Sequence, residues 1–392
     1  MSALAPLATA ETTAHLFHLV EELRPIIGAH QREADALRHL PPAIVQAFAD
    51  RGLMQAMLPA ELGGFGVDPV TCMRLVEEVA SMDGSTGWNF SIGVFSQRWF
   101  GFLPDAWGRA FLATPGAMVA PSLNPVGRAV AVPGGYRVSG RFPFSSGVYQ
   151  ASWVAGGCRV YDGDELRQAS GGGPVAADAL MPQSAVTVID GWQVSGMRGT
   201  GSTGFVAEDV FIPEEHLVIR GVKPRLADPI FRFGVPFGSQ FAMVTLGIAR
   251  CAIEAFIELA QDKQTRPWMP KLRETASAHY DVAKAQAQVE AGRSALLAGI
   301  GEMWEASSEG RDIPMELRAK VRRAQVHAAE SAMEAVDRIC RAAGAPSLFE
   351  AYPFERCLRD VHGAIAQIHL QRGSMEDAGR VTFGLKPLNP LF

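Results

Sequence analysis

The sequence predicts an α+β protein that is mostly helical, because its hydrophobic period changes twice along the chain. Apolar residues recur every three or four positions from Thr12 to about Leu112, every second position from about Met118 to Val218, and every three or four positions again after Pro229. A helical period predicts helices and a period of two predicts half-buried strands. We therefore expect a helical domain, an antiparallel β domain and a four-helix bundle, over residues 1–115, 116–222 and 223–392.

The first domain shows apolar residues at helical spacing in two places, around Ile44-Val45-Phe48 and from Met73 to Met82. The long break between them is PAELGGFGVDP, from Pro59 to Pro69. Three glycines and two prolines exclude a regular helix there, so a loop is expected.

The β domain contains the most informative stretch of the chain, GYRVSGRFPFSSG from Gly135 to Gly147. Its alternation predicts a strand, a tight turn at Ser139-Gly140 and a second strand. Ser145 and Ser146 follow, and glycine comes directly after them, which allows a flat ligand to approach the main chain. Further strands are expected near 128–132, 153–160, 185–190 and 208–212.

The bundle is expected to contain four helices, over Ser239–Asp262, Arg273–Glu305, Pro314–Ala343 and Pro353–Leu385. His362 and His369 would lie seven residues apart on the last helix and share one face. A histidine on a helix is more often packed or exposed than catalytic. The pair Arg359-Asp360 fits a charged surface stripe as well as it fits a functional motif.

Composition and charge exclude several classes of function. The chain has 392 residues, a formal net charge of −5 and a pI near 6.0, so nothing indicates nucleic-acid or anionic-membrane binding. No apolar run is long enough to span a membrane, and MSALAPLATAETTAHLF lacks the basic and apolar parts of a signal peptide. A soluble, cytoplasmic protein is expected.

Cysteine usage and motif searches give further exclusions. The five cysteines are odd in number and far apart, which favours reduced thiols over disulfides or zinc, and no metal site is expected. Hydrolase, zinc-protease and phosphate-loop motifs are absent from the sequence. Gly199 to Gly204 fits the dinucleotide pattern GxGxxG, but a strand is expected after it where a Rossmann turn needs a helix. A ligand-contacting β-turn is the better interpretation.

Taken together, these segments resemble the acyl-CoA dehydrogenase superfamily along nearly the whole chain. The resemblance is carried by PAELGGFG, the turn from Met82 to Trp88, GYRVSGRFPFSSG, GMRGTGSTGFVAEDVFIP and Leu358-Arg359-Asp360. It implies a helical domain, a middle β-barrel-like domain, a four-helix bundle, a bound flavin and commonly a homotetramer built as a dimer of dimers.

Two activities of that superfamily compete. Acyl-CoA dehydrogenases use a carboxylate base, but neither Pro236–Phe241 nor Gln367–Arg372 offers one, which leaves only Glu376 or Glu254. The sequence more closely resembles the oxygenase components of two-component flavin-dependent monooxygenases. These use reduced flavin and O2 to hydroxylate a small aromatic or heteroatom-containing substrate through a C4a-hydroperoxyflavin. A relative that binds flavin or acyl groups without turnover is a third alternative.

The resemblance also implies the site residues. Ser146 would donate hydrogen bonds near the flavin, and His369 would act as a base on a phenol, indole N–H or hydroxylamine. Cofactor contacts, with FAD or FMN as reduced flavin, would come from Ser122, Asn124, Phe144, Ser145, Ser146, Trp153, Thr200, Gly201 and Ser202, and from Arg266 and Gly344 of a neighbouring subunit. The substrate would contact Trp88, Phe90, Phe95 and Phe241. A separate NAD(P)H:flavin reductase would supply the flavin.

Overall fold

The computed structural model describes residues 9–233, 238–389 and 392, and these divide into two compact units. The sheet unit comprises Met1–Val67, Ile92–Gln193 and Arg198–Arg232, and the helical unit comprises Asp68–Ser91, Val194–Met197 and Phe233–Phe392. Residues 1–8, the start of the N-terminal stretch that lacks the features of a signal peptide, lie outside the described residues. Pro236 and Phe237, from the segment Pro236–Phe241 in which no carboxylate base is present, also lie outside them. The three-domain division stays a prediction.

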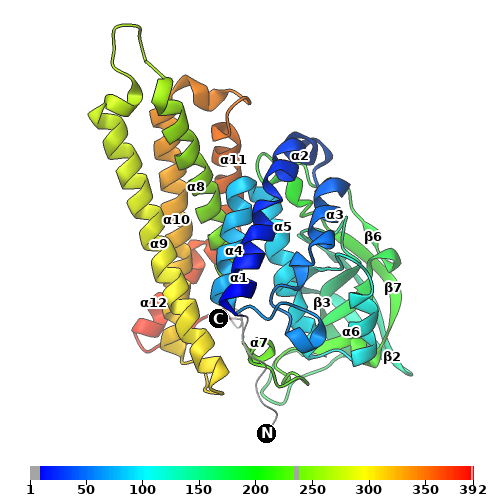
Figure 1. Ribbon diagram of the computed structural model, residues 1–392. Coiled ribbons are helices and arrows are strands. Elements are labelled where there is room, and N and C mark those ends of the chain that lie inside the picture. The colour runs from blue at the N-terminus through cyan, green and yellow to red at the C-terminus, as the bar shows by residue number, and fades with distance from the viewer. Residues whose placement is uncertain (1–8, 234–237, 390–391) are drawn as a thin grey trace. The chain divides into compact units, whose positions relative to one another are not determined.

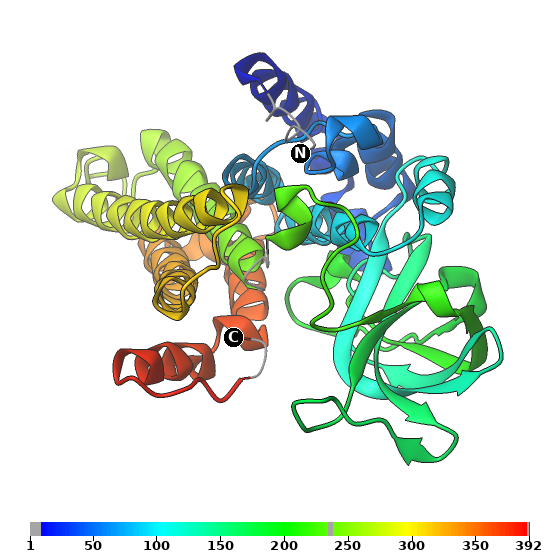
Figure 2. The ribbon, with the colours of Figure 1, turned by 90° about the horizontal axis from the view of Figure 1, so that it is seen from below.

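The sheet unit holds an eight-stranded sheet in the order β6-β7-β2-β1-β3-β5-β8, with β4 paired to β3, among the residues described. Figures 1 and 2 show these strands, cyan to green, as a strongly twisted and curved sheet. The pairings are antiparallel, as predicted, except that β1 runs parallel to β3. The strands are β1 Val119–Val132, β2 Gly135–Phe142, β3 Trp153–Asp162, β4 Glu165–Leu166, β5 Ala176–Pro182, β6 Thr187–Val188, β7 Phe205–Pro213 and β8 Leu217–Ile219.

The predicted turn at Ser139-Gly140 is wrong, because β2 continues through it as one strand. The pairing of β2 with β7 shifts register between Val138 and Gly140, and Asp209 of β7 adopts a φ of 53° there. A side chain at Gly140 would come within 2.9 Å of the Cα of Gly127 on β1. This glycine therefore allows the close approach of β2 to β1 beside a bulge in the β2–β7 pairing, which local sequence cannot distinguish from a turn.

Helices of the sheet unit lie mainly in the N-terminal part of the chain. They are α1 Ala10–Glu21, α2 Arg24–Leu37, α3 Pro42–Asp50, α6 Asp105–Leu112 and α7 Pro229–Arg232. The predicted loop between Pro59 and Pro69 is confirmed, interrupted only by the short 3-10 helix η2 at Ala60–Leu62.

The helical unit is built on α8, α9 and α10, which lie side by side in Figure 1. Its helices are α4 Pro69–Met82, the first part of α5 Gly84–Phe95, α8 Ser239–Asp262, α9 Ala276–Ser308, α10 Met315–Ala343, α11 Phe354–Ile365 and α12 Arg372–Thr382. Asp68 caps α4 by accepting bonds from the Val70 and Thr71 amides at 2.8 and 3.0 Å. Within the described residues no helix is long and apolar enough to cross a membrane.

The single helix predicted over Pro353–Leu385 is wrong. The chain leaves α11 after Ile365, forms the 3-10 helix η9 at Ile368–Leu370 and starts α12 at Arg372. Gln367 has an extended backbone, and its side chain accepts a bond from the His369 amide at 2.6 Å, which replaces the helical hydrogen bond. His362 and His369 therefore do not share one helix face.

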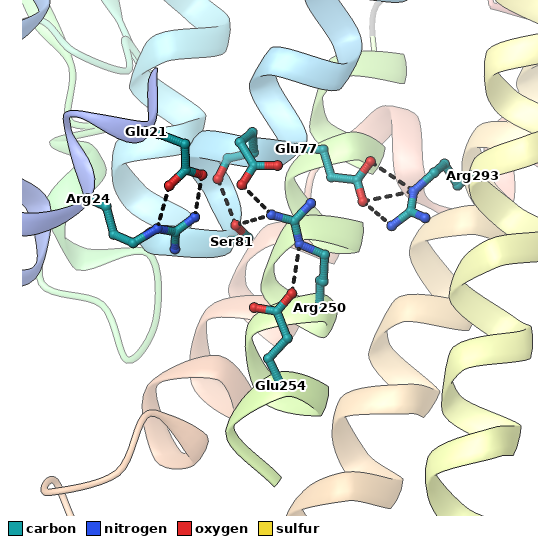
Figure 3. A network of polar contacts seen from close by, with 8 residues as sticks. Glu21, Arg24, Glu77, Ser81, Arg250, Glu254 and Arg293 are labelled. Carbon is teal, nitrogen blue, oxygen red and sulfur yellow. Dashed lines mark hydrogen bonds and ion pairs between the residues drawn. The ribbon is translucent and has the colours of Figure 1, made fainter. Parts of the chain in front are cut away.

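Paired charges join α4 to the bundle (Figure 3). Glu77 of α4 forms a forked ion pair with Arg293 of α9, with contacts at 2.8 and 2.9 Å to the guanidinium Nε. Its neighbour Glu78 accepts a bond from Arg250 of α8 at 2.6 Å, and Ser81 accepts another from the same guanidinium at 2.6 Å. Because a bidentate pair fixes direction as well as distance, the Glu77–Arg293 contact sets how α4 lies on α9, and the Arg250 contacts tie α4 to α8.

Candidate functional site

In the sheet unit, three buried hydroxyls form a continuous line, the hydroxyl row of Ser146, Ser202 and Thr200. The oxygens of Ser146 and Ser202 lie 2.7 Å apart, and Ser202 donates to Thr200 Oγ1 at 2.7 Å. Backbone bonds hold the same segments together, from the Ser145 amide to Thr203 O at 2.6 Å and from the Gly147 amide to Thr200 O at 3.0 Å. These contacts continue beyond the β2–β7 pair, which ends at Phe142 and Phe205.

Phe144 lies beside the hydroxyl row and is unusual in two respects. Its φ is 56°, in the left-handed region that large side chains seldom adopt, and the residue is 70% exposed. Neighbouring Ser145 is fully buried and donates to Ala120 O at 3.2 Å, and Ser122 donates to Pro143 O. The chain thus turns an aromatic ring outward between anchored neighbours, which is the kind of strain found at ligand sites.

The remaining cofactor residues predicted in the sheet unit lie on β1, on β3 and in the turn of the hydroxyl row. Asn124 is exposed on β1. Gly201 sits within the turn of the hydroxyl row with a φ of 56°. Trp153 begins β3 and makes edge contacts with Trp107 and His216, at ring-centroid distances of 5.6 and 5.4 Å.

The helical unit contains a second polar group, the histidine cluster of His369, Arg322, Gln325 and Ser239. Arg322 approaches His369 Nδ1 at 3.4 Å, and Gln325 links His369 O, at 2.7 Å, to the Ser239 hydroxyl, at 3.1 Å. Burial, and then the charge of Arg322, lower the pKa of His369 to about 4. Burial lowers the pKa of Arg322 to about 10, with Arg318 adding to the effect.

Aromatic side chains predicted to contact the substrate are buried. Trp88 of α5 stacks on Phe241 of α8 with ring centroids 4.0 Å apart. Asp83 caps α5 by accepting bonds from the Thr86 amide and hydroxyl at 2.7 and 2.8 Å, which fixes the helix that carries Trp88. Phe90 is also buried on α5, and Phe95, at its end, belongs to the sheet unit.

Arg266 and Gly344 both lie in the helical unit. Arg266 is exposed after α8, with its guanidinium 5.7 Å from the Trp268 ring centroid. Gly344 ends α10, where Lys263 donates to the neighbouring Ala343 O.

Sequence reasoning missed Gln240. It is 1% exposed, and its Oε1 is buried without a hydrogen-bond partner among the described residues. A buried acceptor of this kind costs free energy unless a ligand completes it. Gln240 directly precedes Phe241, so its position next to a predicted substrate residue was the available signal.

Two further observations bear on the chemistry. A groove of about 550 Å³ in the sheet unit is lined by Phe102, Leu217, Val222 and Arg225 among others, and its lining includes none of the predicted site residues. The described residues contain no group of three or more histidine, cysteine or acidic side chains suited to a metal ion. The five cysteines are free.

Comparison with known proteins identifies the family. Residues 18–97 match the family described as acyl-CoA dehydrogenase, N-terminal domain, and residues 239–372 match acyl-CoA dehydrogenase, C-terminal domain. The chain is 30% identical over 390 residues to a flavin-dependent monooxygenase, oxygenase subunit HsaA, of Mycobacterium tuberculosis, with 94% of this chain and 95% of that protein covered. The chain belongs to the flavin-dependent monooxygenases of the acyl-CoA dehydrogenase superfamily.

Other relatives of this monooxygenase agree. It is 29% identical to indole-3-acetate monooxygenase of Pseudomonas putida, over 91% of this chain and 90% of that one. The crystal structure of the Mycobacterium tuberculosis HsaA monooxygenase superposes with a TM-score of 0.87, at 29% identity, covering 97% of this chain and all of that one. XiaF from Streptomyces, in complex with FADH2 and glycerol, shares the fold with a TM-score of 0.87 at 24% identity, covering 97% and 98%.

The residues that the dehydrogenase alternative needs are poorly placed in this monooxygenase. Glu376 pairs with Arg372 at 2.7 Å, and Glu254 pairs with Arg250 at 3.3 Å. Both carboxylate side chains are 59% exposed. A base that removes a weakly acidic α-proton is normally desolvated, so neither residue suits that role.

Proposed function

We propose that this chain is the oxygenase component of a two-component system that takes up reduced FAD or FMN and hydroxylates a small aromatic or heteroatom-containing substrate with O2. When bound, reduced flavin supplies the two electrons that allow one oxygen atom of O2 to enter the substrate while the other leaves as water. The observation that carries the proposal is the buried hydroxyl row beside the outward-facing Phe144 ring.

The hydroxyl row suits the edge of a planar heteroaromatic ring that carries both N–H and C=O groups, and Phe144 offers an aromatic face beside it. Ser122, Asn124, Ser145, Trp153 and Gly201 are the further residues of the sheet unit that we propose around such a ring. Arg266 and Gly344 would complete the phosphate end from a neighbouring subunit.

The direction of the hydroxyl bonds gives Ser146 a defined role. A serine carries one hydroxyl proton, and that of Ser202 is donated to Thr200. Ser146 then supplies the proton in its 2.7 Å contact with Ser202, and we propose that its oxygen accepts from a ligand, in place of the donor role that the resemblance implied for it. The N5 atom of a flavin carries a proton only in the reduced form, and an acceptor at Ser146 therefore favours the reduced cofactor.

The histidine cluster is our candidate for proton handling on the substrate. At neutral pH a pKa of about 4 leaves His369 unprotonated, which is the form that a base requires. So low a pKa also means that His369 cannot retain a phenol's proton and holds it only while the substrate oxygen or nitrogen reacts. Arg322 stabilises negative charge that develops next to the imidazole.

On the substrate side, we propose Trp88, Phe90, Phe95 and Phe241 as apolar contacts. Gln240 adds one polar contact, because its orphaned Oε1 accepts an O–H or N–H of an aromatic substrate. The pairing of stacked rings with one acceptor favours phenols and indoles over saturated thioesters.

The remaining parts of the proposal concern partners and setting. The names of the relatives, an oxygenase subunit and an oxygenase component, support a separate NAD(P)H:flavin reductase and a small-molecule substrate. A homotetramer and a cytoplasmic location stay predictions, and the phosphate site shared between subunits requires the former.

The experiment that tests the function is anaerobic mixing with chemically reduced FAD or FMN, followed by addition of O2. The visible absorbance of oxidised flavin should return much more slowly than with free flavin, because a dry pocket protects the oxygenated cofactor from water. Return at the rate of free flavin would overturn the proposal. An acyl-CoA that bleaches bound oxidised flavin without oxygen would favour the dehydrogenase alternative instead.

A further inference from the structure

Three of the five cysteines lie on neighbouring helices of the helical unit. Cys251 is on α8, Cys340 on α10 and Cys357 on α11, and each of these helices packs against the other two. Figure 1 shows α8, α10 and α11 next to one another, in green and orange. The thiols of Cys251 and Cys357 are hydrogen-bonded to each other. Direct contact between two thiols is the first geometric condition for a disulfide.

Access separates Cys251 from the other cysteines. It is partly exposed, whereas the other four are buried. An oxidant dissolved in water therefore reaches Cys251 more easily than any other thiol of the chain. Burial raises the pKa of Cys158 and that of Cys340 to about 12, so both of these thiols stay protonated at neutral pH.

Charge distinguishes Cys251 as well. The hydrogen bond donated by the Cys357 thiol lowers the pKa of Cys251, and Arg356 of α11 adds to this effect. Burial, Glu254 of α8 and Asp83 before α5 act in the opposite direction without cancelling it. The thiolate is the nucleophilic form of cysteine, so Cys251 is the reactive sulfur of the pair and Cys357 is the neighbour that donates to it.

A flavin-dependent monooxygenase makes an oxidant for such a pair. Hydrogen peroxide is released whenever O2 accepts the two electrons of reduced flavin without passing an oxygen atom to a substrate. We propose that Cys251 and Cys357 are a peroxide modification site, at which oxidation joins α8 to α11 by a reversible disulfide. None of the predicted flavin or substrate residues is part of this site, so the inference goes beyond the proposed function.

The oxidation takes two steps. The Cys251 thiolate attacks one peroxide oxygen, the O–O bond breaks, and the departing hydroxide takes up a proton to become water. The sulfur is thereby oxidised by two electrons to a sulfenic acid, and the peroxide is reduced. The Cys357 sulfur then attacks the Cys251 sulfur, the S–O bond breaks, and the hydroxyl leaves with the Cys357 proton as a second water.

Cys340 is the competing partner, because its thiol lies close enough to influence the pKa of Cys357. Its Sγ donates to Phe354 O at 3.6 Å, and the residue is 5% exposed. Cys340 thus lacks both the access and the thiolate character of Cys251. Replacing Cys340 gives a matched control, since it removes a neighbouring thiol but should leave the disulfide intact.

The test uses the purified full chain without flavin or reductase, treated with hydrogen peroxide and then alkylated and digested for peptide mass spectrometry. In the wild type we expect a peptide linked through Cys251 and Cys357 that dithiothreitol separates, and a fall in titratable thiols from five to three. Before oxidation, iodoacetamide at neutral pH should modify Cys251 at least about tenfold faster than any other cysteine.

Three variants assign the roles. Cys357→Ser keeps a hydroxyl that can donate to Cys251 but cannot form the disulfide, so dimedone should trap oxidised Cys251 as the sulfenic acid. Cys251→Ala should give neither the linked peptide nor a dimedone adduct at Cys357. Cys340→Ala should form the linked peptide as the wild type does.

The inference is overturned if the wild type forms no link between Cys251 and Cys357, or if the link uses Cys340 instead. A sulfenic acid at Cys357 in Cys251→Ala would overturn it as well. The wild-type peptide map decides the question even where a variant fails to fold. Because peroxide is added directly, a chain that binds no reduced flavin would overturn the proposed function and leave this result unaffected.

Discussion

The hydroxyl row of the sheet unit and the charged contacts of the helical unit use different chemistry to order side chains. In the row, neutral oxygens lie 2.7 Å apart between segments already aligned by strands β2 and β7. In the helical unit, Glu77, Arg293 and Arg250 join helices that have no shared backbone ladder, and Arg322 plays a similar part beside His369.

The charged contacts therefore serve the packing of helices, whereas the hydroxyl row serves ligand recognition. Buried charges are costly to desolvate, so removing one partner leaves a large penalty in the folded state. Hydroxyls are cheap to bury once bonded, and their protons can be redistributed when one is removed. Substitutions among the charges should therefore change stability most, and substitutions in the hydroxyl row should change ligand preference most.

The largest effect is expected from breaking the Glu77–Arg293 pair. Glu77→Ala leaves the Arg293 charge without its partner, and the side chain of Glu77 is only 5% exposed. We expect the free energy of unfolding to fall by about 3–5 kcal/mol in urea titrations. The matched control is Glu254→Ala, whose pair with Arg250 is 59% exposed on the glutamate side and should cost less than about 1 kcal/mol. Equal losses would contradict the assignment of α4 docking to Glu77.

The next effect concerns His369 and pH. Its pKa is near 4 when folded and near 6.5 when unfolded, so the unfolded chain binds the extra proton between these values. Stability from this residue is therefore complete above about pH 6.5 and is lost as the pH falls toward 4. His369→Asn cannot titrate. Between pH 7.5 and pH 5 its free energy of unfolding should therefore fall by about 1–2 kcal/mol less than that of the wild type. Parallel pH profiles would show that His369 is not held neutral by its surroundings.

Much of the fold was predictable because hydrophobic period is local information. Helix α8 begins and ends at the predicted residues, Ser239 and Asp262. The parallel pairing of β1 with β3, the bulge at Gly140 and the break of the last helix before His369 were not predictable. Each depends on partners far along the chain or on a side chain replacing a helical bond.

The candidate site likewise contains residues that the sequence predicts and residues that it does not. Ser146 and Ser202 stand out in the sequence because each is adjacent to glycines after or before a strand, and the β2–β7 register then brings these ends together. The burial of Asp360 depends on packing between helices, as does the lack of a hydrogen-bond partner for Gln240 Oε1 among the described residues, and no local pattern reports either.

A smaller effect is expected when the hydroxyl row loses its ligand contact. Ser146→Ala removes the acceptor that we assign to the cofactor N–H while leaving the Ser202–Thr200 bond intact. Affinity for reduced flavin should fall about tenfold, the equivalent of one hydrogen bond, and more of the consumed O2 should appear as hydrogen peroxide. Ser152→Ala is a suitable control, since Ser152 donates only a long bond of 3.4 Å to Met118 O. Unchanged affinity and peroxide yield would remove Ser146 from the site.

The smallest effect is the most specific. Ser202→Ala removes the oxygen to which Ser146 donates, so the Ser146 proton becomes available to a ligand acceptor. Oxidised flavin presents an acceptor at N5 and reduced flavin a donor, so the variant should bind oxidised flavin more tightly and reduced flavin no better. We expect the ratio of the dissociation constant for oxidised flavin to that for reduced flavin to fall about fivefold, measured by titration with each redox form. Thr200→Val tests whether the effect comes from the direction of the hydrogen bonds in the row or simply from the loss of the hydroxyl next to Ser146. In this variant Ser202 keeps its contact with Ser146 but loses the acceptor that orients its own proton. The ratio should narrow there as well, and a ratio that stays unchanged in both variants would mean that the hydroxyl row does not read the redox state of the cofactor.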